Sequence, residues 1–254
     1  MGDNAGLANF GAVLDPLPEG SLVAVVTMRG SLCPITLGHM QGFEEARRLL
    51  LAEAGVPRPA RLEKFAATLG FISLNGDRHV NWKLQDIGEP SLSWATRWHL
   101  VELAIADISW MSLETFEGES MEELKRRWSK LTFIHFYMNG ADDVVAHSKY
   151  TWASRDARYI TMGRQGFTEQ VIEGMANHGL DADDGLFILG PELPEISSTQ
   201  ARRALAEGDT ETLRLLLHPR VTQWCLRHSP YAPSADEEGL PASTADDSNM
   251  AEQA

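Results

Sequence analysis

Short apolar runs alternate along the chain with stretches that have helical periodicity. Residues 22–27 (LVAVVT) form a continuous run of this kind, which is typical of a strand buried on both faces of a sheet. Similar runs predict further strands at 67–74, 131–138, 158–162 and 186–189. Strands that alternate with helices favour an α/β fold with a doubly wound parallel sheet, covered by helices on both sides.

Helices are expected between these strands and after the last one. Thr36 is the predicted N-cap of a helix that ends near Gly55. A second helix is expected over 94–108, and the region from Ser197 to Ser229 is expected to form at least two more. The chain shows no internal repeat.

The two ends of the chain differ from the predicted core. Residues 1–20 are expected to be a flexible segment, and residues 21–231 to form one domain. Residues 232–254 contain six acidic residues, no Lys or Arg, and few large apolar side chains. Such a segment cannot repay the entropy lost on ordering, so we expect a disordered acidic tail.

Composition and charge exclude several classes of protein. With 36 acidic against 22 basic residues, the net charge of −14 repels nucleic acid and anionic lipid surfaces. The chain has neither a signal-peptide pattern nor the roughly 18 consecutive apolar residues of a membrane span. Two cysteines, Cys33 and Cys225, are too few for a disulfide framework. We therefore expect a cytoplasmic or nuclear protein that binds neither nucleic acid nor membrane, and a homo-oligomer stays open.

The loop after the first predicted strand contains a candidate anion site. It reads RGSLCPITLGH over 29–39. Gly30 lets backbone N–H groups approach an anion, while Thr36 and His39 lie three residues apart, on one face of the first helical turn. The pattern is therefore typical of a phosphate site, although Thr36 could be only a helix cap and His39 only a surface histidine.

A second candidate follows the last predicted strand, where residues 196–205 read ISSTQARRAL. Ser197 and Gln200 have the spacing of a capping box, so they mark a helix N-terminus, which attracts anions. Arg202 lies in the same first turn, and its planar fork suits a polyphosphate. The alternative is a well-capped helix with solvated arginines.

Together the two loops resemble a known family. The patterns G-S-x-x-P-I-T-x-x-H and I-S-S-T-x-x-R-R-A-L are similar to those of the nicotinamide/nicotinate mononucleotide adenylyltransferases of the eukaryotic type, within the (H/T)xGH nucleotidyltransferase superfamily. The resemblance continues, in the family's order, through Ile72-Ser73, Asp77, Arg97, SWMSLETFE at 109–117 and Gly140-Ala141-Asp142. It implies a Rossmann-like nucleotidyltransferase domain over 21–231.

The resemblance also implies roles for individual residues. It assigns His39 and Arg202 to catalysis. Nucleotide binding is assigned to Gly30, Ser31, Leu32, Thr36, Lys83, Thr115, Gly140, Asp142, Trp152, Arg164, Ser198 and Thr199. Asp142 could instead be a helix N-cap and Trp152 a core aromatic, and Trp128 is the candidate for a second aromatic stacked on the pyridine ring.

The implied reaction joins nicotinamide or nicotinate mononucleotide to ATP and releases pyrophosphate, with Mg²⁺ bound on ATP and no metal site in the protein. Two alternatives stay open. The chain could be another nucleotidyltransferase of the superfamily, such as one acting on phosphopantetheine. It could also be a nucleotide-binding protein without catalysis, because Leu32-Cys33 replaces the family's Phe-Asn and Lys83 is the only lysine near the second loop.

Cys33 allows two interpretations. Beside backbone amides and a helix N-terminus, a thiolate is favoured, which predicts a reactive cysteine that ATP would shield. The other interpretation is a buried, inert cysteine that packs as a small hydrophobic side chain.

Overall fold

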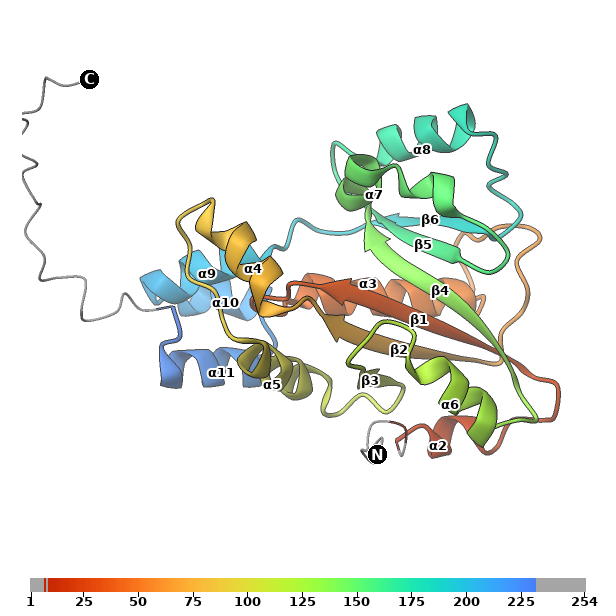
Figure 1. Ribbon diagram of the computed structural model, residues 1–254, viewed down its shortest axis with the longest axis horizontal. Coiled ribbons are helices and arrows are strands. Elements are labelled where there is room, and N and C mark those ends of the chain that lie inside the picture. The colour runs from red at the N-terminus through yellow and green to blue at the C-terminus, as the bar shows by residue number, and fades with distance from the viewer. Residues whose placement is uncertain (1–6, 8, 232–254) are drawn as a thin grey trace, which may run out of the picture.

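The computed structural model describes residue 7 and residues 9–231. Its centre is a six-stranded sheet in which all strands are parallel, in the order β3-β2-β1-β4-β5-β6 (Figure 1). The strands are β1 (Leu22–Gly30), β2 (Ala67–Leu74), β3 (Met111–Leu113), β4 (Thr132–Gly140), β5 (Arg158–Gly163) and β6 (Phe187–Glu192). This topology confirms the predicted α/β fold with a doubly wound sheet.

Five of the six strands coincide with the predicted apolar runs. β2 is buried along its whole length, and β1 is buried over six consecutive residues, because helices cover both faces of the sheet. The exception is β3, which pairs with β2 at the edge. A strand of three residues is too short to produce a periodicity that the sequence could show.

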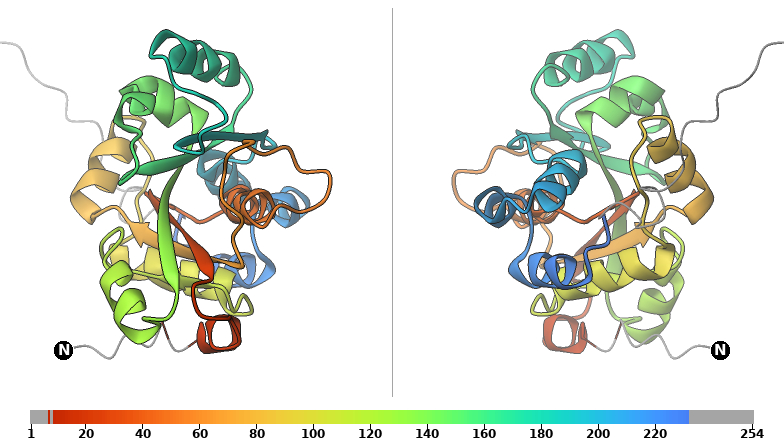
Figure 2. Two further views of the ribbon diagram at one scale, coloured as in Figure 1. Left: turned by 90° about the vertical axis from the view of Figure 1, so that its right-hand side faces the viewer. Right: turned by 90° about the vertical axis from the view of Figure 1, so that its left-hand side faces the viewer.

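Helices cover the two faces differently (Figure 2). One face packs on the largest apolar cluster, which unites α3 (Leu37–Leu50), α5 (Trp94–Ile105), α9 (Ser198–Glu207), α10 (Thr210–Leu216) and α11 (Pro219–His228). The other face carries two smaller clusters. They involve α2 (Gly11–Leu14) with α6 (Ser120–Arg127), and α7 (Ala141–His147) with α8 (Thr168–Asn177).

Two short elements complete the structure. Helix α4 (Asp77–Gln85) follows β2, and the 3₁₀ helix η1 (Lys149–Trp152) follows α7. The region from Ser197 to Ser229, expected to form two or more helices, forms three. Among the described residues, no helix is long and apolar enough to cross a membrane.

The expected flexibility of residues 1–20 is wrong for the part that the structure describes. Leu7, Phe10 and Leu14 are buried beneath α6, and the Phe10 ring packs edge-on against Phe71 of β2, with centroids 5.3 Å apart. This short segment covers the lower part of one sheet face, so burial of apolar area orders it. The expected acidic tail, residues 232–254, lies outside the described residues.

Truncation of Phe10 tests this packing. We expect Phe10→Ala to lower the free energy of unfolding by about 3–5 kcal/mol, because it leaves a cavity against β2. Val13→Ala, at a half-buried position one turn away, is the control and should cost about 1 kcal/mol or less. Urea denaturation measures both, and a Phe10 effect no larger than the control would show that the segment does not contribute to the core.

Candidate functional site

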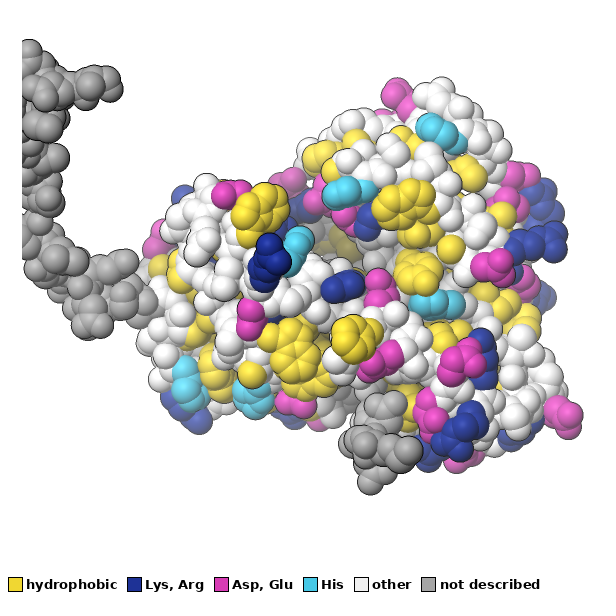
Figure 3. Space-filling model, in the orientation of Figure 1, with side chains coloured by type: hydrophobic (Ala, Val, Ile, Leu, Met, Phe, Trp, Pro, Cys, Tyr) yellow, Lys and Arg dark blue, Asp and Glu magenta, His cyan; other side chains and the backbone are white. Residues whose placement is uncertain are grey.

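The candidate site lies at the carboxyl edge of the sheet, where β1 and β4 are neighbours and the strand order reverses. Ligands of doubly wound proteins bind at this point, because the connections leave the two central strands in opposite directions and open a crevice. The surface is hollowed between α4 and α7, beyond the ends of these strands (Figure 3). The loop after β1 and the start of α9 meet close to it.

A capping box shapes the loop after β1. Thr36 is the N-cap of α3, as predicted, and its backbone N–H donates to Nδ1 of His39 over 3.0 Å. The hydroxyl of Thr36 lies 2.7 Å from the same nitrogen. Thr36 and Leu32 are both buried, and Leu32 has a φ of +43°, which is rare for a residue with a side chain. The side chains of Leu32 and Thr36 are therefore packed inside the protein, and Thr36 fixes the orientation of the His39 ring.

The hydrogen bonds of His39 fix its tautomer. Because a backbone N–H can only donate, Nδ1 must be the acceptor, and the proton of the neutral ring lies on Nε2. Burial, followed by the positive charges of Arg164 and Lys83, lowers the pKa of His39 to about 4. At neutral pH the site therefore contains an uncharged imidazole with one N–H to donate, and two predicted cations lie near it.

An ion pair joins the first turn of α7, which follows β4, to the loop after β5. Arg164 donates to a carboxylate oxygen of Asp142 over 2.7 Å, and both side chains are partly exposed. Gly140, not Asp142, is the N-cap of α7, so the alternative role of Asp142 as a cap is wrong. A Cβ atom on Gly140 would lie 2.6 Å from Asp142 Oδ1, so the absence of a side chain at Gly140 leaves room for this carboxylate.

The start of α9 is bound to the loop after β1. Ser197 and Gln200 form the predicted capping box, with the Gln200 N–H donating to Ser197 Oγ over 3.2 Å. Ser198 donates from its hydroxyl to the carbonyl of Pro34 over 2.8 Å. Thr199 is exposed beside them. The two loops that the sequence singled out are therefore one structural unit.

The alternative interpretation, in which Arg202 is a solvated arginine, is wrong. Only 6% of it is exposed, and its guanidinium forms an ion pair with Glu89 from the segment after α4. It also donates to the carbonyl of Cys33 over 2.7 Å and to the hydroxyl of Thr199 over 3.0 Å. No sequence pattern pointed to Glu89, because the contact spans 113 residues. By contrast, Arg203 is solvated.

A second arginine, Arg97, is completely buried behind the site. It donates to the carbonyls of Ser31 (2.9 Å), Asn75 (2.8 Å) and Leu92 (3.1 Å), and to the carboxylate of Asp77 (2.9 Å). One side chain therefore joins the loops after β1 and β2 and the segment that precedes α5. Ser31 contributes its carbonyl to this arrangement and remains partly exposed itself.

A polar cluster that sequence reasoning missed lies on β1 and β4, on the face of the sheet that carries the two smaller apolar clusters. Thr27 Oγ1 lies 2.9 Å from His135 Nε2 and 3.2 Å from a carboxylate oxygen of Glu117. Burial lowers the pKa of His135 to about 4 and raises the pKa of Glu117. The Tyr137 ring packs beside His135, with centroids 4.3 Å apart. Polar side chains at alternate positions of an apolar strand were the available signal.

The aromatic residues near this cluster differ from the expectation. Trp128 is buried, and its indole N–H donates to Asp15 over 2.7 Å, so its assignment to the site is wrong. Trp152 is 53% exposed, which excludes its alternative role as a core aromatic, and the Lys149 ammonium lies 6.0 Å from its ring centroid. Phe116 is 69% exposed on the loop before α6.

The remaining assigned residues occupy exposed and buried positions. Lys83 and Thr115 are exposed, on α4 and on the loop after β3. Cys33 is buried, its sulfur accepts the N–H of Leu92 over 3.3 Å, and it lies 3.6 Å from the hydroxyl of Tyr231. This burial favours the inert interpretation of Cys33, because reactive thiols are at least partly accessible.

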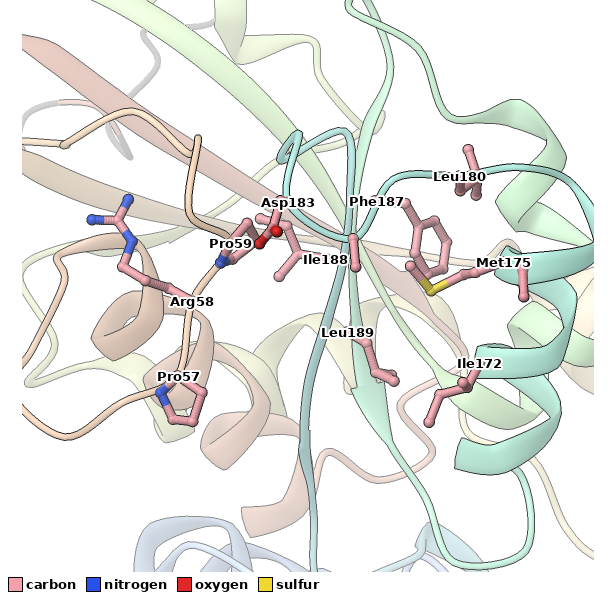
Figure 4. A pocket seen from close by; sticks show the side chains of 12 residues that line it. Pro57, Arg58, Pro59, Ile172, Met175, Leu180, Asp183, Phe187, Ile188 and Leu189 are labelled. Carbon is pink, nitrogen blue, oxygen red and sulfur yellow. The ribbon is translucent and has the colours of Figure 1, made fainter.

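A separate hollow lies outside this region. It has a volume of about 390 Å³ and lies between the segment around Pro59 and the inner side of α8, with Met175, Phe187 and Leu189 in its wall (Figure 4). Its lining is mainly apolar, with Arg58 and Asp183 as the charged members. Among the described residues, no group of three or more His, Cys, Asp and Glu side chains could hold a metal ion.

Comparisons with known proteins support the fold. No protein-family model matches the chain, and no curated protein matches its sequence. Among solved structures, a Plasmodium falciparum nicotinic acid mononucleotide adenylyltransferase, complexed with APC, superposes with a TM-score of 0.51 at 14% sequence identity. The match covers 82% of this chain and 96% of that one. The Rossmann-like fold that the resemblance implied is therefore confirmed.

The tautomer and acidity of His39 can be measured. We expect ¹⁵N NMR of the free protein to show an Nε2–H imidazole that titrates near pH 4, well below the ordinary histidine value of about 6.5. Because the folded-state pKa is the lower one, the unfolded chain binds the proton first. The contribution of His39 to the free energy of unfolding therefore falls as pH drops from about 6.5 toward 4. A protonated Nδ1, or a midpoint above pH 6, would contradict this geometry.

Proposed function

We propose that this protein transfers the adenylyl group of ATP to nicotinamide or nicotinate mononucleotide and releases pyrophosphate. The observation that carries the proposal is the capping box of Thr36 and His39. It fixes an uncharged imidazole, with its proton on Nε2, at the start of α3 just beyond the carboxyl end of β1, near Lys83 and Arg164. The matched adenylyltransferase fold and the paired sequence motifs support the same assignment.

The proposed reaction requires alignment and charge stabilisation rather than a protein nucleophile. The phosphate of the mononucleotide is already an anion, so it can attack the α-phosphorus of ATP without a general base. Negative charge then gathers on the leaving pyrophosphate, where fixed donors are most effective. His39 would donate its Nε2–H to a phosphoryl oxygen, while Lys83 and Arg164 neutralise charge.

Magnesium is implied as the partner of ATP. The groups around His39 are hydroxyls, amides and cations, and the described residues contain no cluster of carboxylates to hold a metal. Such surroundings fit Mg²⁺ bound through the phosphate oxygens of the nucleotide itself. When bound, the ion would supply further neutralisation of the pyrophosphate charge.

The mononucleotide would bind over β1 and β4, on the face of the sheet that carries the two smaller apolar clusters. Exposed aromatic rings of Phe116 and Trp152 are available to stack on a pyridine ring. Asp142, held by Arg164, offers its second carboxylate oxygen to a ribose hydroxyl or an amide. The assay described next compares the acid and the amide form of the mononucleotide.

One assay separates this proposal from its alternatives. Purified protein is incubated with MgATP and nicotinamide mononucleotide, nicotinate mononucleotide or phosphopantetheine, and dinucleotide and pyrophosphate are followed by chromatography. Dinucleotide from either pyridine substrate supports the proposal. Turnover with phosphopantetheine alone would assign the chain to another nucleotidyltransferase, and ATP binding without any turnover would identify a binding protein, as the occupied guanidinium of Arg202 would allow.

Removal of His39 tests the mechanism. We expect His39→Ala to lower kcat by about 10²–10⁴-fold, with a much smaller change in mononucleotide affinity, because its hydrogen bond strengthens as charge develops. The control is His228→Ala, at an exposed position on α11. Steady-state kinetics measures both variants, and a His39 variant within threefold of the wild type would remove this residue from the mechanism.

A further inference from the structure

The guanidinium of Arg202 has almost no free capacity for a ligand. An arginine has five N–H groups. Glu89 takes the one on Nε and one on a terminal nitrogen, Cys33 takes another, and Thr199 takes a fourth. A phosphate that binds as a two-point fork therefore has to displace a protein acceptor.

Among those acceptors, Glu89 is the one that can leave. Cys33 is part of the backbone of a buried loop, and Thr199 lies on the same helix as Arg202. Glu89 lies instead in the exposed turn that follows α4. Gly88 turns the chain there with a φ of +66°, and the Glu89 N–H donates to the carbonyl of Leu84. This turn directs the carboxylate inward while its neighbours face solvent.

The segment around Glu89 is weakly anchored. Helix α4 buries only Val80 and Leu84, whereas Trp82 and Ile87 are 65% and 57% exposed. In this region the charged side chain of Glu89 is partly buried, whereas the apolar side chains of Trp82 and Ile87 face water. Charged side chains are usually the exposed ones and large apolar side chains the buried ones. Lys83, a proposed phosphate ligand, lies on the same helix.

We propose that Glu89 is a built-in phosphate surrogate, which occupies Arg202 in the free protein and is displaced by a nucleotide polyphosphate. Carboxylate and phosphate are equivalent ligands for the arginine fork, and the buried guanidinium needs an anion at all times. The exchange would release the turn at residues 86–90 as the polyphosphate binds. This inference rests on the proposed function only for the identity of that ligand as ATP.

The exchange predicts that Glu89 competes with the ligand. We expect Glu89→Gln to bind MgATP and inorganic tripolyphosphate about tenfold more tightly than the wild type, because the competing state is no longer populated. Asp86→Asn is the matched control, since it removes one negative charge from the same segment without a contact to Arg202. Isothermal titration calorimetry measures the dissociation constants, and the control should stay within twofold of the wild type.

Equal tightening in both variants would reveal a general charge effect and overturn the proposal. Unchanged or weaker binding by Glu89→Gln would show that Glu89 positions Arg202 permanently, and it would overturn the proposal as well. A lack of tripolyphosphate binding by both the wild type and Glu89→Gln would also overturn it. Tighter tripolyphosphate binding without dinucleotide synthesis supports the exchange and rejects the proposed function, whereas synthesis without a difference in affinity does the opposite.

A measurement on the unaltered protein protects the test from a folding defect in the variant. Amide hydrogen exchange of residues 86–89 should accelerate severalfold when tripolyphosphate binds to the wild type, because the anchor at Arg202 is lost. In Glu89→Gln the same amides should exchange rapidly from the start. Protection that stays constant or increases on binding would mean that the ion pair persists, and the exchange mechanism would be wrong.

Discussion

The buried guanidinium of Arg97 is the interaction on which the site depends. It is fully removed from water, yet three backbone carbonyls and one carboxylate satisfy it. Those carbonyls belong to Ser31, Asn75 and Leu92, so three loops share one partner. Loss of the side chain would leave all three acceptors unpaired in the interior, at a cost of roughly 1–3 kcal/mol each. The loop that holds His39 therefore depends on a side chain that is fully buried behind it.

The two buried arginines of this region have different kinds of partner. Arg97 is surrounded chiefly by backbone, which cannot leave without unfolding of the loops. Arg202 is neutralised by Glu89, a side chain on an exposed segment. A cation satisfied by carbonyls is structural, whereas a cation satisfied by a displaceable carboxylate can exchange it for another anion. Residue type and burial are the same in both cases, so the origin of the partner decides the role.

Local patterns in the sequence were sufficient for five of the six strands, for α3, α5 and the helices after Ser197, and for the two helix caps of the site. Continuous apolar runs predict five strands, and the spacings Thr36 to His39 and Ser197 to Gln200 produce two capping boxes at the expected helix starts. Contacts distant in sequence were not predictable. Nothing near Trp128 indicates that Asp15 will accept its indole N–H, and nothing near Arg202 indicates Glu89. The packing of Phe10 against Phe71 is another contact of this kind, which is why the N-terminal segment was expected to be flexible.

At His39, a hydrogen bond sets the orientation of the ring, and other residues supply the positive charge. Thr36 orients the imidazole and fixes its proton on Nε2, but the ring contributes no charge, because burial and the nearby Lys83 and Arg164 keep it neutral. The positive charge near the ring comes from those two cations, of which Arg164 is paired with Asp142, in a protein whose net charge is −14. A protonated His39 would add a third positive charge, but its second N–H would need a hydrogen-bond acceptor to compensate for burial of the charged ring. The neutral tautomer needs no such acceptor, so at neutral pH the burial of His39 does not lower the stability of the folded protein through its charge.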